Sequence, residues 1–176
     1  MKSVITVDEF DRVTGRADKM VAHKHNIRHR AFSVFCLNSS SELLLQQRAY
    51  TKYHSPGLWT NTCCSHPVNE GDIDDEIHER LKFEMGFDTE VEYIFTVPYT
   101  ADLGDGLYEN EIDRIYTGIF NGTPVPNPEE AEAYKWIHID SLSGMISETP
   151  KDFTAWFRIL YPVFYEYHNG ILQKQK

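Results

Sequence analysis

The stretch of sequence that decides the fold is RAFSVFCLN, which spans residues 30–38. Its aromatic and branched side chains favour a β-strand. A serine-rich turn follows at residues 39–41, and LLLQQR at residues 43–48 continues the strand-like pattern. We therefore predict that residues 30–38 and 43–48 are two strands joined as a β-hairpin.

Residues 51–71 interrupt this pattern and are predicted to be a long loop. The signals are the turn-forming residues Pro56, Gly57, Pro67 and Gly71. The same loop carries aromatic and reactive side chains, namely Trp59, Cys63, Cys64 and His66. Loops with such side chains are often functional, so this one is a candidate part of a site.

The elements after this loop indicate the fold class. Residues 72–85 are predicted to be a helix, because acids fill its first turns and Gly86 follows its end. Further strands are predicted near residues 91–98, 110–120 and 134–139. Apolar side chains at helical spacing predict a helix over residues 152–161, which Pro162 should kink or end. Strands outnumber helices without regular βαβ alternation, so we predict an α+β fold with a mixed or antiparallel sheet flanked by helices.

Length and charge limit the classes of function. The 176 residues suffice for one domain with its own core, and we expect residues 1–176 to be a single domain. The net charge of −10 argues against nucleic-acid binding and against adhesion to anionic membranes. Residues 1–52 differ from the rest, because they hold nine basic and five acidic residues. This basic third of the chain could line an anion site.

The cysteines and the N-terminus point to a reducing compartment. No apolar run approaches the roughly 20 residues of a membrane span, and the first residues lack the apolar stretch of a signal peptide. The three cysteines are Cys36, Cys63 and Cys64. We therefore expect reduced thiols and a cytoplasmic protein.

Two features of the first 66 residues suggest chemistry, and each has a plain alternative. His23 and His29 lie just ahead of the first predicted strand, where they could bind a metal or could be two surface histidines. Cys64 precedes His66 by two residues in the long loop, so the two could act as nucleophile, acid/base pair or ligands. The alternative is a buried cysteine pair beside a hydrogen-bonded histidine.

Acidic side chains supply two further features. Glu109 and Glu111 are two residues apart in a predicted strand, so both carboxylates face one side, although a solvated strand start would fit as well. Glu84 falls inside the apolar stripe of its helix, where it needs a partner or a metal. An Arg80–Glu84 pair at the rim of that stripe is the alternative. The three imidazoles and the Glu109–Glu111 pair together suit a six-coordinate divalent metal and not a closed tetrahedral zinc site.

The chain resembles the type I isopentenyl-diphosphate Δ-isomerases over residues 4–165, in one collinear order. The resemblance rests on HRAFSVF at 29–35, LLLQQR at 43–48, PGLWTNTCCSHP at 56–67, EMG at 84–86, ENE at 109–111, and Trp156. The run from Asn61 to Pro67 is the most specific of these motifs. This resemblance implies a Nudix-like fold with a mixed sheet. It also implies that the protein interconverts isopentenyl and dimethylallyl diphosphate in isoprenoid biosynthesis.

The resemblance also implies roles for individual residues. The catalytic positions match Cys64, Glu111 and Tyr99, with Cys64 preferred to Cys63 because it stands two before His66. The ligands of one divalent ion, Mn²⁺ or Mg²⁺ with Zn²⁺ as a third choice, match His23, His29, His66, Glu109 and Glu111. Glu84 matches the carboxylate that serves a diphosphate-bound Mg²⁺. The substrate-binding positions match Lys19, Arg48, Lys52, Arg80 and Trp156.

Some points stay open at this level. His25 competes with His23 as the ligand, and we favour His23 because it keeps Lys19 four residues upstream. A Nudix-type diphosphate hydrolase is the alternative function, but of the paired acids in the hydrolase box only Glu84 is present, with Phe83 in the other place. We expect a monomer or weak dimer, with residues 1–22 as a candidate lid and residues 150–176 as a C-terminal helix.

Overall fold

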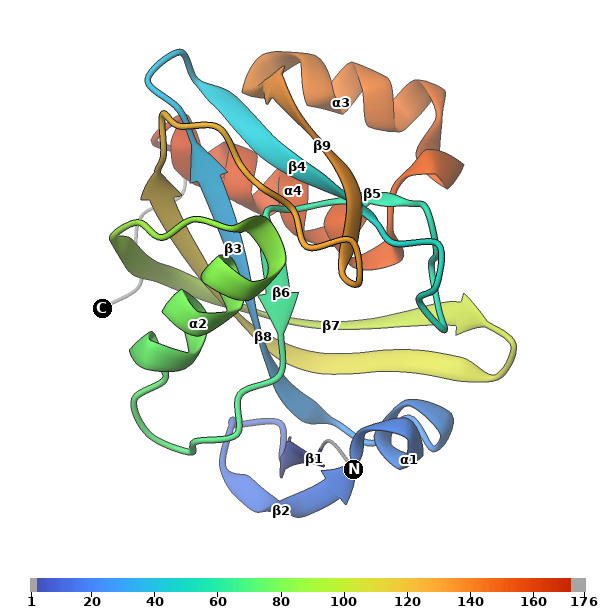
Figure 1. Ribbon diagram of the computed structural model, residues 1–176. Helices are drawn as coiled ribbons and strands as arrows, with labels where there is room; N and C mark the ends of the chain where they lie inside the picture. The colour runs from blue at the N-terminus through green and yellow to red at the C-terminus, as the bar shows by residue number, and fades with distance from the viewer. Residues whose placement is uncertain (1–2, 172–176) are drawn as a thin grey trace.

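The predicted strand at residues 30–38 is the central strand of the sheet. In the computed structural model, which describes residues 3–171, it is β3 (His29–Leu37), and every residue of it is buried. It pairs in parallel with β8 (Leu107–Ile119) along its whole length. On its other side it pairs antiparallel with the short strand β6 (Cys63–Ser65). Figure 1 shows β3 running through the middle of the molecule.

The predicted hairpin between residues 30–38 and 43–48 is wrong over most of its length. β4 (Glu42–Arg48) pairs with β3 only at Leu37 and Leu43. It then diverges and pairs with β5 (Trp59–Thr60) and β9 (Ala131–His138). The Thr62 hydroxyl bridges the gap, because it accepts from the Cys36 amide at 2.9 Å and donates to the Leu44 carbonyl at 2.8 Å.

Residues 51–71 are a loop only in part, because β5 and β6 interrupt them. Cys64 is therefore on a strand that is hydrogen-bonded to β3, opposite Ser33, rather than on a free loop. A strand position gives a reactive side chain a better defined direction than a loop would.

The described part of the N-terminal segment also forms regular structure. β1 (Ser3–Val7) and β2 (Val13–Asp18) are an antiparallel pair, and α1 (Lys19–Lys24) follows. β1 joins the main sheet through Thr6, opposite His29. Val4 and Ile5 are fully buried, so this segment is packed onto the domain. Met1 and Lys2, part of the candidate lid, lie outside the described residues.

The helix predicted after the long loop is confirmed as α2 (Asp74–Met85). Gly86 ends it with a φ of 70°, in the left-handed region that favours glycine. A Cβ at this position would also collide with the Val125 carbonyl. Both constraints require glycine at position 86. This one residue therefore allows α2 to end here and the chain to pack closely against residue 125.

The remaining strands and helices are longer than predicted. β7 (Val91–Gly104) and β8 form an extended antiparallel hairpin whose turn at 104–106 has positive φ at all three residues. α3 (Ile139–Glu148) and a short 3₁₀ turn (Pro150–Asp152) follow β9 and were not predicted.

The sequence predicts that Pro162 kinks or ends the helix, and the second alternative is wrong, because α4 (Ala155–His168) continues through the proline. Buried side chains lie on both sides of the proline, Tyr161 before it and Phe164 after it. We infer that this packing outweighs the lost backbone hydrogen bond, which costs about 3 kcal/mol. Residues 172–176 of the predicted C-terminal helix lie outside the described chain.

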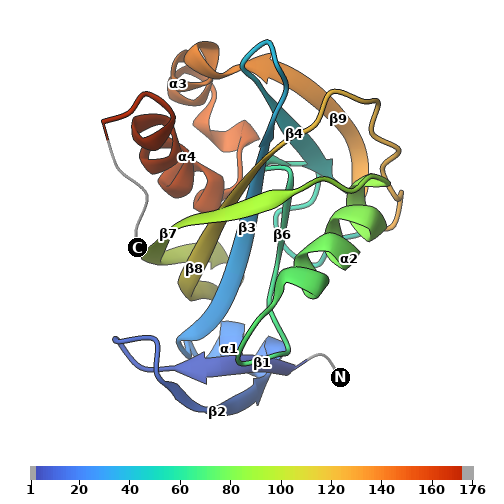
Figure 2. The same ribbon diagram turned by 90° about the vertical axis from the view of Figure 1, so that its left-hand side faces the viewer.

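Helices cover both faces of the sheet, as Figure 2 shows with α2 on one side and α4 on the other. One core cluster joins the sheet to α3 and α4, with Phe35 and Phe157 among its members. The other joins the sheet to α2, with Val34 and Ile77 among its members. The α+β prediction with a mixed, helix-flanked sheet is confirmed. In the part of the chain that is described, no helix has the length and apolarity needed to span a membrane.

Candidate active site

A single cavity of about 520 Å³ collects most of the predicted site residues. Eleven of them line it: Lys19, Arg48, Lys52, Cys64, His66, Arg80, Glu84, Tyr99, Glu109, Glu111 and Trp156. His23 and His29 lie behind this lining, with exposed fractions of 1% and 0%. These thirteen residues come from eight helices and strands and two connecting segments, so the tertiary structure brings together groups that are far apart in the chain.

Strand register places the catalytic candidate Glu111 between two other site residues. The parallel pairing of β3 and β8 sets His29 beside Glu111, and the antiparallel pairing of β7 and β8 sets Tyr99 opposite it. The Tyr99 hydroxyl donates a hydrogen bond to Glu111 Oε2. Glu109 and Glu111 are both buried, which excludes the alternative of a solvated strand start.

Three imidazoles meet beside these carboxylates, with ring centroids 4.9–5.5 Å apart. His23 Nδ1 lies 2.9 Å from the Tyr108 carbonyl, and His29 Nδ1 lies 2.8 Å from the Ile27 carbonyl. Because a carbonyl only accepts, Nδ1 carries the proton in both rings. Their Nε2 lone pairs therefore point toward the centre of the cluster, which is how metal-ligating histidines are usually oriented.

The donor set fits a divalent cation. Single ligand atoms of His23, His29, His66 and Glu109 all lie within 4.8 Å of one another. Among the described residues, His23 Nε2, His29 Nε2 and Glu109 Oε2 are buried without a hydrogen-bond partner. Two buried carboxylates and several unpaired lone pairs facing one point are costly unless a cation lies between them.

Glu111 borders this group of four and contacts two of its histidines. His66 Nε2 donates to Glu111 Oε1 at 2.8 Å, and His29 Nε2 is 3.4 Å from that oxygen. Burial raises the pKa of Glu109 well above its usual value, and the charge of Glu111 adds to this effect. Burial acts in the same direction on Glu111, but its hydrogen bond with His66 holds its pKa well below the usual range. A divalent cation beside these groups would favour the ionised form of both acids.

The structure places His23, and not His25, in this cluster. His23 is buried in the cluster, whereas His25 is exposed at the C-terminal end of α1. α1 begins at Lys19 because the Asp18 side chain accepts from the amides of Met20 and Val21. His23 and Lys19 are then one helical turn apart, and both reach the same region of the protein.

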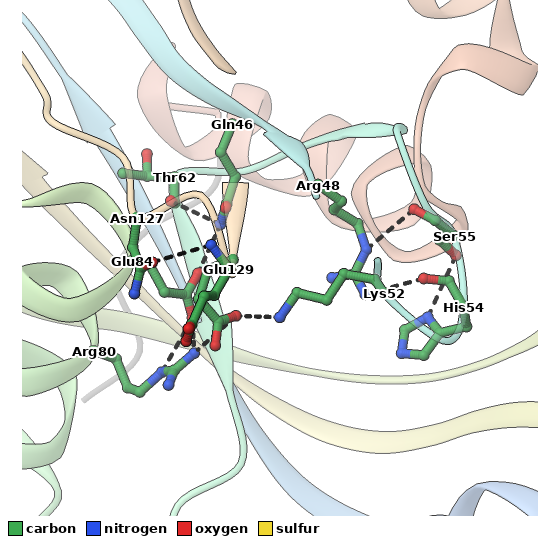
Figure 3. Close-up of polar contacts among 11 residues, drawn as sticks. Gln46, Arg48, Lys52, His54, Ser55, Thr62, Arg80, Glu84, Asn127 and Glu129 are labelled. Atoms are coloured by element: carbon green, nitrogen blue, oxygen red, sulfur yellow. Dashed lines mark hydrogen bonds and ion pairs between the residues drawn. The ribbon is translucent and has the colours of Figure 1, made fainter. Parts of the chain in front are cut away.

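Three of the predicted cationic residues, Arg48, Lys52 and Arg80, lie at another part of the cavity, which Figure 3 shows. Arg80 Nε donates to Glu84 Oε1 at 3.1 Å, so the i,i+4 pair that was the alternative for Glu84 exists, and both residues line the cavity. Gln46 Nε2 donates to the other oxygen of Glu84 at 2.8 Å. Arg48 is held by the carbonyls of His54 and Ser55.

Comparison with known proteins gives this arrangement a family. Residues 27–157 match the NUDIX domain. The chain is 44% identical over 153 residues to isopentenyl-diphosphate Delta-isomerase 2 of Aromatoleum aromaticum, covering 87% of this chain and 81% of that protein. It is 39% identical over 175 residues to isopentenyl-diphosphate Delta-isomerase of Pectobacterium atrosepticum, covering 99% and 98%. The chain belongs to the isopentenyl-diphosphate Delta-isomerase family.

Solved structures agree with the fold of this family. The MutT protein from Methanosarcina mazei Go1 has a TM-score of 0.64 at 16% identity, over 81% of this chain and 95% of that one. At such low identity the likeness concerns the fold alone. The isomerase chain therefore has a Nudix fold whose helix α2 carries Glu84 but not the second acid of the hydrolase box.

The structure distinguishes the two adjacent cysteines of this isomerase-family chain. Successive residues of a strand face opposite sides. Cys63 is fully buried in the cluster under α2, whereas Cys64 packs at the edge of the other cluster and lines the cavity. Burial raises the pKa of the Cys64 thiol, and the charge of Glu84 adds to this, while Arg48 opposes it. Only Cys64 is placed to meet a molecule in the cavity.

Trp156 forms the wall of the cavity near Arg48. It is 3% exposed, and the Arg48 guanidinium lies 5.1 Å from its ring centre. His54 stands edge-on to it with centroids 5.7 Å apart. Burial lowers the pKa of His54 to about 2, and Arg48 and Lys19 add to the effect, so this imidazole is neutral. The Trp156 and His54 rings that form this part of the wall are thus uncharged, and Arg48 beside them carries the only charge of the three.

Several residues at the site were missed by sequence reasoning. Asp113 extends the Glu109–Glu111 face by another two residues, is 1% exposed and accepts from Ser33 Oγ at 2.8 Å. The period-2 run of acids could have revealed it. Gln46 and His54 carried no comparable signal, since a polar residue at a strand end or in a loop is ordinary. Glu130 was also missed.

Proposed function

We propose that this chain interconverts isopentenyl diphosphate and dimethylallyl diphosphate by a 1,3-allylic proton shift. The observation that carries the proposal is the single cavity that both Cys64 on β6 and the Tyr99–Glu111 pair on β7 and β8 line. β6 and β8 flank β3 on its two sides, so the two acid–base groups approach the cavity from different directions. The volume of about 520 Å³ suits a small molecule.

The reaction needs one group on each side of a short carbon chain. A C–H bond forms at C4, the double bond moves from C3–C4 to C2–C3, and the C–H bond at C2 breaks. One group gives the proton and the other accepts one, and their roles exchange in the reverse direction. We assign these roles to Cys64 and to Glu111, with Tyr99 as the hydrogen-bonding partner of Glu111.

Positive charge develops on carbon during the proton transfer, and the cavity must stabilise it without water. Trp156 offers an aromatic face in a desolvated position. A cation over such a face gains about 2 kcal/mol or more. The dry wall also protects the intermediate from attack by water.

The diphosphate group is assigned to the basic part of the cavity. Arg48, Lys52, Arg80 and Lys19 line it and supply the positive charge. Arginine can bind phosphate oxygens in pairs, whereas lysine acts as a point charge. Glu84 would hold a Mg²⁺ against the diphosphate. Binding energy from this group, remote from the reacting carbons, can orient them.

A second divalent ion is proposed at His23, His29, His66, Glu109 and Glu111. Mixed nitrogen and oxygen donors favour Mn²⁺ or Mg²⁺, with Zn²⁺ less suited to six ligands. Such an ion would neutralise the two carboxylates and make a proton on Glu111 more acidic. Hydrogen bonds to the Tyr108 and Ile27 carbonyls hold His23 and His29 in one tautomer.

A product assay tests the proposal. Purified protein is incubated with isopentenyl diphosphate and Mg²⁺ or Mn²⁺ in D₂O, and the organic product and free phosphate are both measured. We expect dimethylallyl diphosphate carrying solvent deuterium, and no phosphate release. Phosphate release without isomerisation would support a hydrolase, and absence of dimethylallyl diphosphate with every divalent ion would refute the proposal.

A further inference from the structure

A carboxylate with no assigned role lies among the cations of the basic part of the cavity. Glu130 accepts from the Lys52 ammonium and lies 3.4 Å from Arg80 Nη2. It lines the cavity together with Glu84. One anion therefore contacts two of the four cations to which the diphosphate is assigned.

The backbone holds Glu130 in this place. Asn127 forms a turn, because its side-chain oxygen accepts from the Glu129 amide at 3.0 Å and its carbonyl accepts from the Glu130 amide at 2.9 Å. The Asn127 amide donates to the Glu84 carbonyl at 2.9 Å, and the Glu130 carbonyl accepts from the Ala49 amide at 3.0 Å. Figure 3 shows Asn127 beside Glu84. The segment 127–130 is thus fixed to α2 on one side and to the end of β4 on the other.

Lys52 and Arg80 come from different parts of the chain and carry like charges, so they repel when no anion lies between them. Glu130 supplies that anion before any substrate enters. Burial acts to raise the pKa of Glu130, but Lys52 and Arg80 together hold it below its usual value, so it is ionised.

Glu130 occupies only part of the hydrogen-bonding capacity of the two cations. Its side chain is 12% exposed, and those of Lys52 and Arg80 are 22% and 23% exposed. Lys52 has three N–H groups, so two remain for a ligand when Glu130 takes one. For Arg80, Nη1 is not engaged by Glu84 or Glu130 in the contacts described above.

We propose that Glu130 is a positioning residue that holds Lys52 and Arg80 together in the arrangement that receives the substrate's diphosphate. This inference rests on the proposed function, because it needs Lys52 and Arg80 to bind that group. It predicts an effect on substrate affinity and little effect on the proton transfer, since Glu130 contacts neither Cys64 nor the Tyr99–Glu111 pair in the described hydrogen bonds. The opposite reading, in which Glu130 competes with the diphosphate, predicts tighter binding when the charge is removed.

Glu130→Gln tests the proposal with Glu129→Gln as its matched control. Both variants remove one negative charge from the same turn, but Glu129 is exposed. We expect Glu130→Gln to raise the KM for isopentenyl diphosphate about tenfold, the loss of one charge-assisted contact, with kcat within about twofold. The inhibition constant of inorganic diphosphate should rise in parallel. Glu129→Gln should behave like the parent chain.

Glu130→Asp keeps the charge and shortens the reach, so its KM should fall between those of Glu130→Gln and the parent chain. It also keeps the proposal testable if Glu130→Gln does not fold, which a thermal melt would reveal. A lower KM in Glu130→Gln, or equal KM values for the Gln variants at positions 129 and 130, would overturn the inference. A parent chain without isomerase activity would instead refute the proposed function.

Discussion

The adjacent cysteines allow the sharpest test of the proposed active site, because one replacement should abolish catalysis and the other should only weaken the core. Both changes are Cys→Ala, so the chemistry of the substitution is the same. Cys63 is fully buried beneath α2, and Cys64 lines the cavity on the opposite face of β6. The alternation of side chains along a strand sets this difference.

The size of each effect follows from these positions. Cys63→Ala deletes one buried heavy atom, comparable to removing a buried methyl group, so the free energy of unfolding should fall by about 1 kcal/mol. In a chain of this length that lowers Tm by about 2–4 °C. Cys64→Ala removes a group that gives or accepts a proton, which typically contributes a factor of about 10²–10⁴ in rate. Its Tm should change less than that of Cys63→Ala, because Cys64 is only partly buried.

The assay is the formation of dimethylallyl diphosphate from isopentenyl diphosphate, with kcat and Tm measured for both variants. We expect Cys63→Ala to keep kcat within about threefold of the parent chain, and Cys64→Ala to lose nearly all turnover while remaining folded. An active Cys64→Ala beside an inactive, folded Cys63→Ala would refute the assignment of the catalytic thiol and the strand geometry behind it.

The remaining predictions concern the metal cluster and the tyrosine. Tyr99→Phe should lower kcat about 10- to 100-fold, because a hydrogen bond to a buried carboxylate such as Glu111 is worth about 1.5–3 kcal/mol. The control Tyr165→Phe loses a surface hydrogen bond to an aspartate and should leave kcat unchanged. Equal kcat values for the two variants would contradict the role of Tyr99. His23→Ala should abolish tight binding of Mn²⁺ measured by calorimetry, while His25→Ala should bind like the parent chain; the reverse result would restore His25 as the ligand. A chelator should stop turnover and lower Tm, since the buried acids then lose their counter-charge, and Mn²⁺ or Mg²⁺ should restore both; an unchanged Tm would argue against a resident ion.

Much of the site could be expected from the sequence because its signals are local. The spacing of Glu109 and Glu111 places both carboxylates on one face of a strand, whatever that strand pairs with. Glu84 could be recognised from its place on the apolar stripe of α2, and Gly86 marks the end of that helix. The choice of Cys64 over Cys63 rested on the family motif, and the structure supports it through their opposite faces.

The errors have a common physical cause, which is pairing between distant segments. The expected hairpin of β3 and β4 fails because the Thr62 hydroxyl takes hydrogen bonds that a ladder between the two strands would use. Pro162 lies inside a helix because the core packs around it, a tertiary effect that local propensity does not contain. Residues 51–71 hold two short strands for the same reason, since each exists only through its partner in the sheet.

The sequence by itself determined the chemical groups, their local spacing and the class of fold, because strand and helix periods depend on neighbouring residues. Only the tertiary structure decided which groups meet. The register of β3, β7 and β8 sets His29 and Tyr99 on either side of Glu111, and the turn at Asn127 brings Glu130 to Lys52. A shift of one residue in any of these pairings would turn the side chains to the other face of the sheet, with no change in the local pattern of the sequence.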